Sequence, residues 1–443
     1  MKTLCLLLMA PLWVASAASE MQAGAAVEDV TPTWGVRKAF VNRPPIKASY
    51  YPVQVMALAI ANRAARVVIV TADIGYFCRE ITEQIHARAR RFGLTPGQIV
   101  LNASHSHSGP AICPVLDVLE ADQIDRRYQQ FFIHSTVRAI QRALAGLRPA
   151  RLATSEAACD VCINRRLNGK MEPNPSGPRD RRLRLLTVRD SDAAEPRAIL
   201  FLFGCHPSDV NDDSFGADFF GFARAAGEAR HPGTIVLSAQ GTGGDVRLDH
   251  RDAGGQRFLW GNLATLDFTK RAGERVAQSL EEALESHSTP VEGRIRSSTR
   301  QIELPLASPP SREEVSQAIG SSDLWKARWA RSVMNLYDRS AKIPRTVPYT
   351  IQAVSIGSSF EIVALDGEAF TGLGAQIERR LSPRRTFVLG YSNTSAGYIP
   401  TADEIPKGGY EIGVYYWWLT PAPFAPELER TLVESAVELA RKN

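Results

Sequence analysis

The segment Ile99-Val100-Leu101-Asn102-Ala103-Ser104-His105-Ser106-His107-Ser108-Gly109-Pro110 places two imidazoles and three hydroxyl groups directly after a run of apolar residues. The apolar run predicts the end of a buried strand, and Gly109-Pro110 forces the chain to turn. Both histidines therefore fall on a loop at a strand end, which is where α/β proteins commonly bind their ligands.

The spacing of the two histidines bears on their roles. We expect His105 and His107 to point to opposite faces of the chain unless the backbone bends between them. On that expectation, one imidazole is a metal ligand and the other is an acid or base. An isolated H-x-H pair is, however, more often two ordinary polar loop histidines than a site. The pair therefore indicates a functional site only if further candidate metal ligands occur elsewhere in the sequence.

Suitable partners follow other predicted strand ends. The apolar run before Gly204-Cys205-His206-Pro207 repeats the order of buried strand, histidine and proline. Another apolar run ends in Asp366-Gly367-Glu368, and a loop rich in glycine and tyrosine holds Tyr398 and Tyr410. Two neutral imidazoles with one carboxylate are a common ligand set for catalytic zinc, which keeps a further position open for water. These residues alone favour a metal-assisted hydrolase.

Composition limits the class of protein. The chain has 443 residues, of which 44% are hydrophobic and 22% are charged, as in an ordinary globular protein with a large core. The net charge of +5 is small for this length, and the basic residues occur in scattered clusters such as Arg179-Asp180-Arg181-Arg182. This pattern argues against nucleic acid as a partner.

Apolar periodicity predicts an α/β protein. Strand patterns alternate with helical patterns, and neither an internal repeat nor a dividing linker is evident. We therefore predict a mixed β-sheet core flanked by helices, with the site at strand-end loops, in a single domain over residues 18–443. The predicted strands are 26–32, 53–61, 66–72, 99–101, 151–162, 183–188, 198–203, 234–238, 295–306, 349–356, 360–365 and 386–389. The predicted helices are 81–92, 128–144, 219–230, 263–284, 375–381 and 426–442.

Two other segments have a distinct composition. Residues 168–178 are rich in Pro, Gly and Asn, and we expect a long loop that caps another part of the molecule. Residues 311–337 form a largely helical insert that carries Trp325 and Trp329. Helices as aromatic as this one usually pack into a core and less often cover a lipid-binding mouth.

The N-terminus indicates export. Met1-Lys2, an apolar centre at 6–10 and Ala15-Ser16-Ala17 are typical of a secretory signal peptide with an A-x-A cleavage site. We expect residues 1–17 to be removed and the mature protein to be secreted or periplasmic. Beyond the signal peptide, Cys159 and Cys162 are expected to form a local disulfide or to remain free thiols. A zinc knuckle is less well supported, because the sequence has no second C-x-x-C.

Two more predicted strand ends carry polar or flexible residues. Asp73 ends one strand and is a candidate for a metal's outer shell, although an Asp in this position more commonly caps a helix or stabilises a turn. Gly241-Thr242-Gly243-Gly244-Asp245 follows another strand but lacks the spacing of a phosphate-binding loop. Close approach of this backbone to a substrate is an equally good explanation for the glycines.

The strand-end segments occur in an informative order. Asn102–Pro110 resembles the T-H-T-H-S-G-P-G segment of the neutral (non-lysosomal) ceramidases, and Gly244-Asp245-Val246 resembles the start of their G-D-V-S-P-N. The other matching segments are Asn164-Arg165 with N-R-S, Gly367-Glu368-Ala369-Phe370 with G/A-E-F, Gly397-Tyr398-Ile399-Pro400-Thr401 with the start of G-Y-V-T-T-P-E-E-Y, and Tyr410-Glu411 with Y-E-G. The resemblance runs from about Ala26 to Glu411.

The resemblance implies a zinc amidase that hydrolyses an N-acyl bond. It also implies that the substrate is ceramide or a similar lipid amide and that a membrane surface is one place where the enzyme meets it. Zinc lowers the pKa of its bound water to about 7, which makes hydroxide available to attack the amide. By position, the ligands of the one zinc ion are His105, His206, Glu368 and Tyr398. His107 is then the general acid/base, while Arg165 and Tyr410 hold the carbonyl oxygen as negative charge builds on it.

Three departures from the family pattern bear on the substrate. Arg247-Leu248-Asp249 stands where the family has the Ser-Pro-Asn of a polar pocket wall, so we expect altered headgroup contacts. Ala111-Ile112-Cys113 replaces glycines and is expected to make another wall narrower or more apolar. One helix follows Tyr416, without the family's C-terminal β-sandwich domain, so presentation to lipid is expected to differ.

Two other functions remain open on the sequence. One is a zinc hydrolase of a non-lipid amide, in a sugar or a peptide, and the other is a non-catalytic exported binding protein on the same fold. An apolar trench long enough for an acyl chain favours the lipid amide, whereas a wet and shallow cleft favours the non-lipid amide.

Overall fold

The computed structural model of the chain describes residues 21–41, 43–114, 123–210, 212–259 and 264–443. The predicted signal peptide, residues 1–17, lies outside these ranges. No helix within the described ranges is long and apolar enough to cross a membrane.

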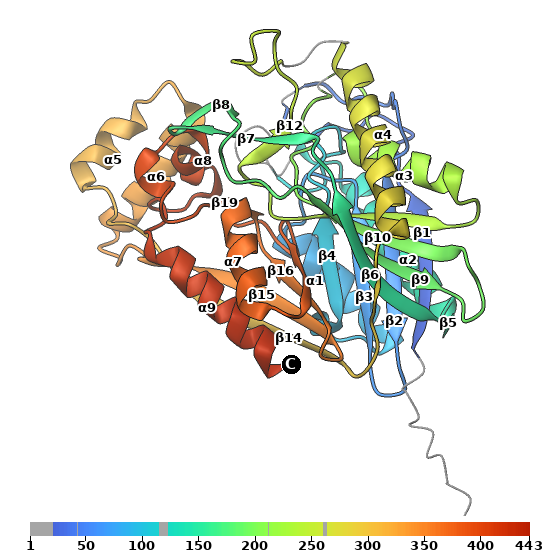
Figure 1. Cartoon of the computed structure of the whole chain (residues 1–443). Coiled ribbons are helices and arrows are strands. Elements are labelled where there is room, and N and C mark those ends of the chain that lie inside the picture. The colour runs from blue at the N-terminus through green and yellow to red at the C-terminus, as the bar shows by residue number, and fades with distance from the viewer. Residues whose placement is uncertain (1–20, 42, 115–122, 211, 260–263) are drawn as a thin grey trace, which may run out of the picture.

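Three sheets form the body of the molecule (Figure 1). The first has the order β4-β3-β2-β1-β5, the second β11-β10-β9-β6-β13 and the third β14-β15-β16-β18. Their strands are β1 Gln22–Asp29, β2 Gln54–Ala61, β3 Arg66–Ala72, β4 Ile99–Ala103, β5 Arg148–Pro149, β6 Arg151–Ala158, β9 Arg182–Arg189, β10 Pro196–Phe203, β11 Ile235–Gln240, β13 Thr289–Pro290, β14 Ile295–Pro305, β15 Thr346–Ile356, β16 Phe360–Leu365 and β18 Arg385–Leu389.

The three sheets share one apolar core. Leu58 of the first sheet, Leu200 of the second and Ile362 of the third belong to the same buried cluster. Successive residues of a strand point to opposite faces, so the remaining apolar residues of these strands lie on the outer faces. Strands that are buried on both faces read as nearly continuous apolar runs, which is why β2, β10 and β16 show no polar alternation.

Helices cover the outer face of each sheet. The first sheet packs against α1 (Arg79–Ala89) and α2 (Arg126–Ala145), and the second against α3 (Asp218–Arg230) and α4 (Ala264–Glu285). The third packs against α7 (Thr371–Leu381) and α9 (Glu427–Lys442). The predicted class, a mixed β-sheet core flanked by helices, is confirmed.

The predicted long loop at 168–178 is wrong, because most of it is a hairpin. β7 (Cys162–Leu167) pairs with β8 (Lys170–Asn174) and with β12 (Val246–Leu248) in a small separate sheet. Asn168 and Gly169 form the turn, with φ of 53° and 79°. A two-residue turn with both φ positive matches the right-handed twist of the strands, and Asn-Gly is the usual sequence for it. The single strand predicted at 151–162 is likewise two strands, β6 and β7, in different sheets.

The helical insert predicted at 311–337 is confirmed as α5 (Arg312–Ile319) and α6 (Leu324–Asp338). The buried ring of Trp329 packs with Val315 and Val333, and its Nε1 donates to the carbonyl of Thr420 at 2.9 Å. The pair lies against the segment that contains α8 (Tyr410–Gly413) and the 3-10 helix η5 (Val414–Trp418).

The topology brings the predicted site residues to one end of the three sheets. β4 runs parallel to β3, β10 parallel to β11, and β16 parallel to β18, so each sheet contains one parallel pair. His105, His206 and Glu368 follow the carboxyl ends of β4, β10 and β16. The carboxyl ends of parallel strands are where α/β folds place their ligands.

Asp73, at the end of β3, has a structural role. Its carboxylate accepts hydrogen bonds from the Arg224 guanidinium at 2.6 and 3.0 Å and from the Gln54 amide at 2.9 Å. Both members of this ion pair are 1% exposed. Asp73 therefore joins the first sheet to α3 rather than capping a helix.

Candidate metal centre

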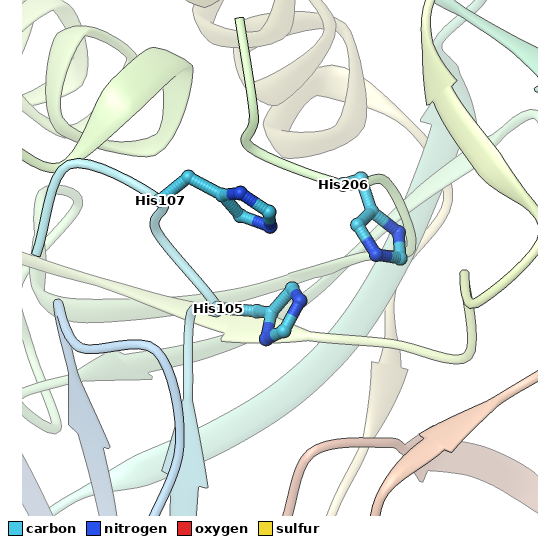
Figure 2. Close-up of side chains that lie close together, drawn as sticks. All are labelled: His105, His107 and His206. Carbon is cyan, nitrogen blue, oxygen red and sulfur yellow. The ribbon is translucent and has the colours of Figure 1, made fainter. Parts of the chain in front are cut away.

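Three histidine rings meet at the ends of two sheets. His105 and His107 come from the loop after β4, and His206 comes from the loop after β10, with all three rings directed into one space (Figure 2). One ring nitrogen from each lies within 4.8 Å of the others, so this group could hold a metal ion. The two loops are joined directly, because the His107 amide donates to the Pro207 carbonyl at 3.1 Å.

The expectation that His105 and His107 point to opposite faces is wrong. Side chains two positions apart share a face of an extended chain, so the spacing alone gave no reason for them to diverge. The chain also bends here, since His105 has a left-handed φ of 64°. Their ring centroids are 5.1 Å apart. A bulky residue with positive φ is an uncommon and strained feature that concentrates at functional sites.

Backbone carbonyls fix the tautomer of two of the histidines. Nδ1 of His105 lies 2.8 Å from the Gly75 carbonyl, and Nδ1 of His206 lies 2.9 Å from the Gly243 carbonyl. A carbonyl oxygen only accepts hydrogen bonds, so each Nδ1 must carry the proton. In a neutral ring the lone pair is then on Nε2. Metal-binding histidines are commonly oriented in this way.

Both of these Nε2 atoms face one carboxylate oxygen. Oε2 of Glu368 is 3.0 Å from Nε2 of His206 and 3.3 Å from Nε2 of His105. Burial lowers the pKa of His105 to about 4 and holds the pKa of His206 well below its usual value, so both rings are neutral at pH 7. Two lone pairs and a carboxylate oxygen in contact repel one another unless a cation or a proton lies between them.

A metal ion fits this arrangement better than a proton. A proton on Glu368 satisfies one of the two imidazoles and leaves the other lone pair unpaired in a buried site. Two ligands at tetrahedral positions about 2.0–2.1 Å from zinc are separated by about 3.3 Å, close to both nitrogen–oxygen distances. Burial raises the pKa of Glu368, and a cation bound at this carboxylate would oppose that shift.

Glu368 and Tyr398 are held opposite each other by backbone pairing. β17 (Glu368–Ala369) and β19 (Tyr398–Ile399) form a two-residue parallel ladder in which these two residues are direct partners. The Tyr398 hydroxyl forms a side-chain hydrogen bond with Glu368 that lowers the pKa of that carboxyl. Gly244 makes room for the ladder, because a Cβ there would lie 2.3 Å from the Glu368 carbonyl oxygen. Gly244 thus serves a close backbone approach within the protein rather than the predicted approach to a substrate.

His107 has a different environment from the other two histidines. Its ring stacks on Phe40 with centroids 4.3 Å apart, and its Nε2 is buried without a hydrogen-bond partner among the described residues. Burial and the neighbouring His105 and His206 hold the pKa of His107 well below its usual value. A neutral imidazole with a nitrogen free beside the Glu368 cluster is able to take up a proton or to bind a metal.

Arg165 reaches the site through Tyr398. Its Nη2 donates to the Tyr398 hydroxyl at 3.0 Å and to the Gly244 carbonyl at 2.9 Å, and its Nε donates to Glu411 at 2.9 Å. Glu411 has no exposed side-chain surface and also pairs with Arg166. The carboxylate of Glu411 therefore locks the guanidinium of Arg165 in place.

Tyr410 lies farther out than the other predicted residues. It is 40% exposed, and its ring centroid is 6.0 Å from that of Tyr398. The structure thus brings six predicted residues into one contact network, namely His105, His107, His206, Glu368, Tyr398 and Arg165. The seventh, Tyr410, stands at the entrance.

His105, His107 and Glu368 line a cavity of about 500 Å³. Much of its wall is aromatic or apolar, with Phe40, Tyr76, Trp417 and Trp418 on it beside Tyr398 and Tyr410. Pockets of this size and character commonly enclose most of a small ligand. Thr394 and Ser395 supply polar groups, and Arg79 supplies a cation.

The departures from the family pattern have different positions in the structure. Arg247 and Leu248 are fully buried, and Arg247 forms an ion pair with buried Asp209 at 2.9 Å behind the His206 loop. Arg247 thus supports a loop rather than forming a pocket wall.

Cys113 is disulfide-bonded to Cys78, which lies on the cavity wall, and the bond ties the loop after His107 to the start of α1. Cys159 and Cys162 are buried free thiols, one of the two predicted states.

Sequence reasoning missed Tyr391, which follows β18. Its hydroxyl lies 3.3 Å from Nδ1 of His206, and its ring centroid lies 4.6 Å from that of His105. It has a φ of 50°, held by hydrogen bonds from its amide to the Gly367 carbonyl and from the Ala103 amide to its carbonyl. The only signal in the sequence was its position directly after Gly390, which itself follows the apolar run of β18.

Comparison with known proteins identifies the fold that carries this site. Neither a protein-family model nor a curated protein sequence matches the chain. The crystal structure of neutral ceramidase from Pseudomonas aeruginosa matches with a TM-score of 0.72 and 18% identity, over 96% of this chain and 75% of that one. A ceramidase complexed with C2 matches with a TM-score of 0.73 and 17% identity, over 95% and 75% of the two chains. The chain therefore has the fold of the neutral ceramidases, as the order of its motifs predicted.

Proposed function

We propose that the protein is a zinc-dependent amidohydrolase that cleaves the N-acyl bond of ceramide or a similar lipid amide. The observation that carries this proposal is the contact of two neutral imidazole Nε2 atoms with the single oxygen Oε2 of Glu368. The neutral ceramidase fold and the aromatic cavity beside these atoms support the same conclusion.

The residues that would hold the one zinc ion are His105, His206, Glu368 and Tyr398. Bound there, zinc supplies a Lewis acid that polarises a carbonyl and lowers the pKa of water to about 7. The carbonyls of Gly75 and Gly243 keep the Nε2 lone pairs of the two histidines directed at the ion. Burial and Glu368 raise the pKa of Tyr398 well above its usual value, whereas Arg165, which donates to its hydroxyl at 3.0 Å, acts in the opposite direction and favours the ionised form as a ligand.

Three other side chains would transfer the proton and stabilise the negative charge that develops on the carbonyl oxygen. Nε2 of His107 is neutral and unpaired, so it accepts a proton from the attacking water and then donates it to the leaving amine nitrogen. The hydroxyl of Tyr410, at the entrance, donates a hydrogen bond to the carbonyl oxygen of the substrate. Arg165 adds positive charge beside that oxygen, where it stabilises the tetrahedral intermediate.

The wall of the cavity favours a lipid amide over the non-lipid alternative. Trp417, Trp418, Tyr76 and Phe40 offer aromatic surface to an acyl chain, while Thr394 and Ser395 offer hydroxyls to a polar headgroup. Burying a methylene group is worth about 0.8 kcal/mol, so an acyl chain gains affinity along such a wall. The unpaired Nε2 of His107 favours turnover over a purely binding role. A signal peptide at 1–17 would deliver the enzyme to the periplasm or the exterior.

The test is metal analysis together with hydrolysis by the purified protein. We expect about one zinc per chain, release of fatty acid from a fluorescent short-chain ceramide, loss of activity on chelation and its return with zinc. Protein that hydrolyses the amide equally well after complete zinc removal would contradict the metal proposal. Activity on a water-soluble peptide or sugar amide, with none on ceramide, would support the non-lipid alternative, and inactivity of the zinc form on every amide would support the binding protein.

A further inference from the structure

Strongly exposed apolar side chains gather at the entrance of the cavity. In the described part of the chain, the large apolar residues with the greatest exposure are Leu324 at 75%, Tyr410 at 40%, and Leu167 and Leu259 at 38% each. Tyr410 lies on the cavity wall itself. Leu324 is the first residue of α6, and Leu167 is the last residue of β7.

Leu324 is joined to the cavity wall through η5. Asp323, the N-cap of α6, accepts a hydrogen bond from the Tyr416 hydroxyl at 2.7 Å. Tyr416 directly precedes Trp417 and Trp418, which line the cavity, and the Trp417 ring centroid is 5.5 Å from that of Tyr410. The start of α6 therefore lies beside the entrance rather than at a remote surface.

Leu167 lies near the same entrance, at the end of β7. The β7–β8 turn packs closely on residues 408–409, because a Cβ on Gly409 would lie 1.7 Å from the Gly169 carbonyl oxygen. Arg166 also donates to the Gly408 carbonyl at 2.8 Å. Tyr410 follows directly. α6, α8 and β8 accordingly lie together at one end of the molecule, upper left in Figure 1.

The helical insert at this end is basic. Residues 311–345 contain seven Lys or Arg and four Asp or Glu. Lys326 and Arg331 are exposed on α6 and have no ion-pair partner among the described residues. Trp325 is half-buried beside Leu324, within a cation–π distance of 5.6 Å from Arg328. Leucine and tryptophan next to lysine and arginine are typical of a segment that lies in the interface of a bilayer.

We propose that the surface formed by Leu167, Leu324 and Trp325, which we term the entrance rim, docks the enzyme on an anionic lipid bilayer. The apolar side chains enter the headgroup region, while Lys326 and Arg331 contact anionic headgroups. Docking places the aromatic cavity against the bilayer, where a lipid amide passes into it without crossing bulk water. The role given to docking rests on the proposed function, but binding to the bilayer itself does not require catalysis.

The test measures binding to vesicles that contain no substrate. The full protein is sedimented with vesicles of phosphatidylcholine alone or of phosphatidylcholine with about one third phosphatidylglycerol, an anionic lipid. We expect tighter binding to the anionic vesicles, weakened by salt, because headgroup attraction is screened. Leu324→Glu should reduce the partition coefficient at least about tenfold, since the variant must insert a charge in place of a leucine.

Leu259→Glu is the control, because Leu259 is an exposed leucine outside the entrance rim, at 38% exposure against 75% for Leu324. This control should bind vesicles like the unchanged protein. Both variants should hydrolyse a water-soluble short-chain amide normally, which separates docking from the proposed function. Equal vesicle binding by both variants and the unchanged protein would overturn the proposal. So would absence of vesicle binding together with a dimer in sedimentation that Leu324→Glu dissociates, because the rim would then join two copies of the chain.

Discussion

Glu368 and Tyr398 are partners in the β17–β19 ladder, although 29 residues lie between them in the chain. The Glu368 amide donates to the Gly397 carbonyl at 2.8 Å, and the Phe370 amide donates to the Ile399 carbonyl at 2.9 Å. The carboxylate and the phenol therefore reach the histidines as one rigid unit. Such preorganisation lowers the entropic cost of assembling a metal site.

Glu368→Gln should weaken zinc binding more than Tyr398→Phe. The amide keeps the shape of the side chain but removes the negative charge, so we expect zinc affinity to fall by at least about 100-fold. Tyr398→Phe removes a single oxygen and should cost about 10- to 100-fold. Competition with a chromogenic chelator measures both values. A larger loss in Tyr398→Phe than in Glu368→Gln would show that the phenol, and not the carboxylate, is the principal anionic ligand.

The two histidines of the H-x-H pair should separate metal binding from turnover. His105→Ala removes an Nε2 that contacts Glu368, so we expect zinc and activity to be lost together. His107→Ala should retain zinc while kcat falls by about 10²- to 10⁴-fold, the usual contribution of a general acid/base. Metal content and kcat are measured on the same preparations. Zinc retained in His105→Ala but lost in His107→Ala would reverse the two roles.

Glu411→Gln should lower activity without removing the metal. The carboxylate pairs with the guanidinium groups of both Arg165 and Arg166, and breaking a buried pair by removing one partner costs about 3–5 kcal/mol. We expect a lower free energy of unfolding and a fall in kcat, because Arg165 loses its fixed orientation. Glu404→Gln is the control, since Glu404 pairs with Arg166 but not with Arg165. Equal kcat values in the two variants would show that Glu411 acts only on stability.

The sequence was sufficient to predict where the site residues stand along the chain. Each apolar run buried between two layers ends where its strand ends, so the positions of His105, His206 and Glu368 after β4, β10 and β16 were visible. The helices were predicted for the same reason, because one apolar stripe must face a sheet. The Asn168-Gly169 turn was visible too, but the surrounding Pro, Gly and Asn residues suggested a loop.

The contacts within the site were not visible in the sequence. Arg165 and Glu411 are 246 positions apart, and nothing local to either predicts that they pair. His105 and Tyr391 both have positive φ, and the backbone of Tyr391 is held by hydrogen bonds to Gly367 and Ala103, which are distant in the sequence. Tyr391 lacked any motif of its own. Tertiary contacts of this kind decide which polar residue near a strand end becomes part of the site.

Asp218 should make the protein less stable as the pH rises from about 4 to 7. Burial and the neighbouring Asp209 raise the pKa of its carboxyl from 3.8 to about 7 in the folded state. Between these values the folded state holds a proton that the unfolded state has lost, so ionisation favours unfolding and stability falls with increasing pH. Over the full range the effect is of the order of 4 kcal/mol. Below pH 4 both states are protonated and the penalty is absent.

Asp218→Asn tests this effect, because the amide has nearly the same shape and does not ionise. Asn also tolerates the left-handed φ of 53° at this position, and its oxygen still accepts from the Phe219 amide, which lies 2.7 Å from the carboxylate. Urea unfolding at pH 4, 5.5 and 7 should show a shallower decline in the free energy of unfolding than in the unchanged protein. Asp190→Asn is the control, since Asp190 is a partly exposed carboxylate whose pKa is lowered by Arg148. An identical decline in Asp218→Asn and the unchanged protein would mean that Asp218 is ionised in the folded state well below pH 7, stabilised by the amides of Val210 and Phe219.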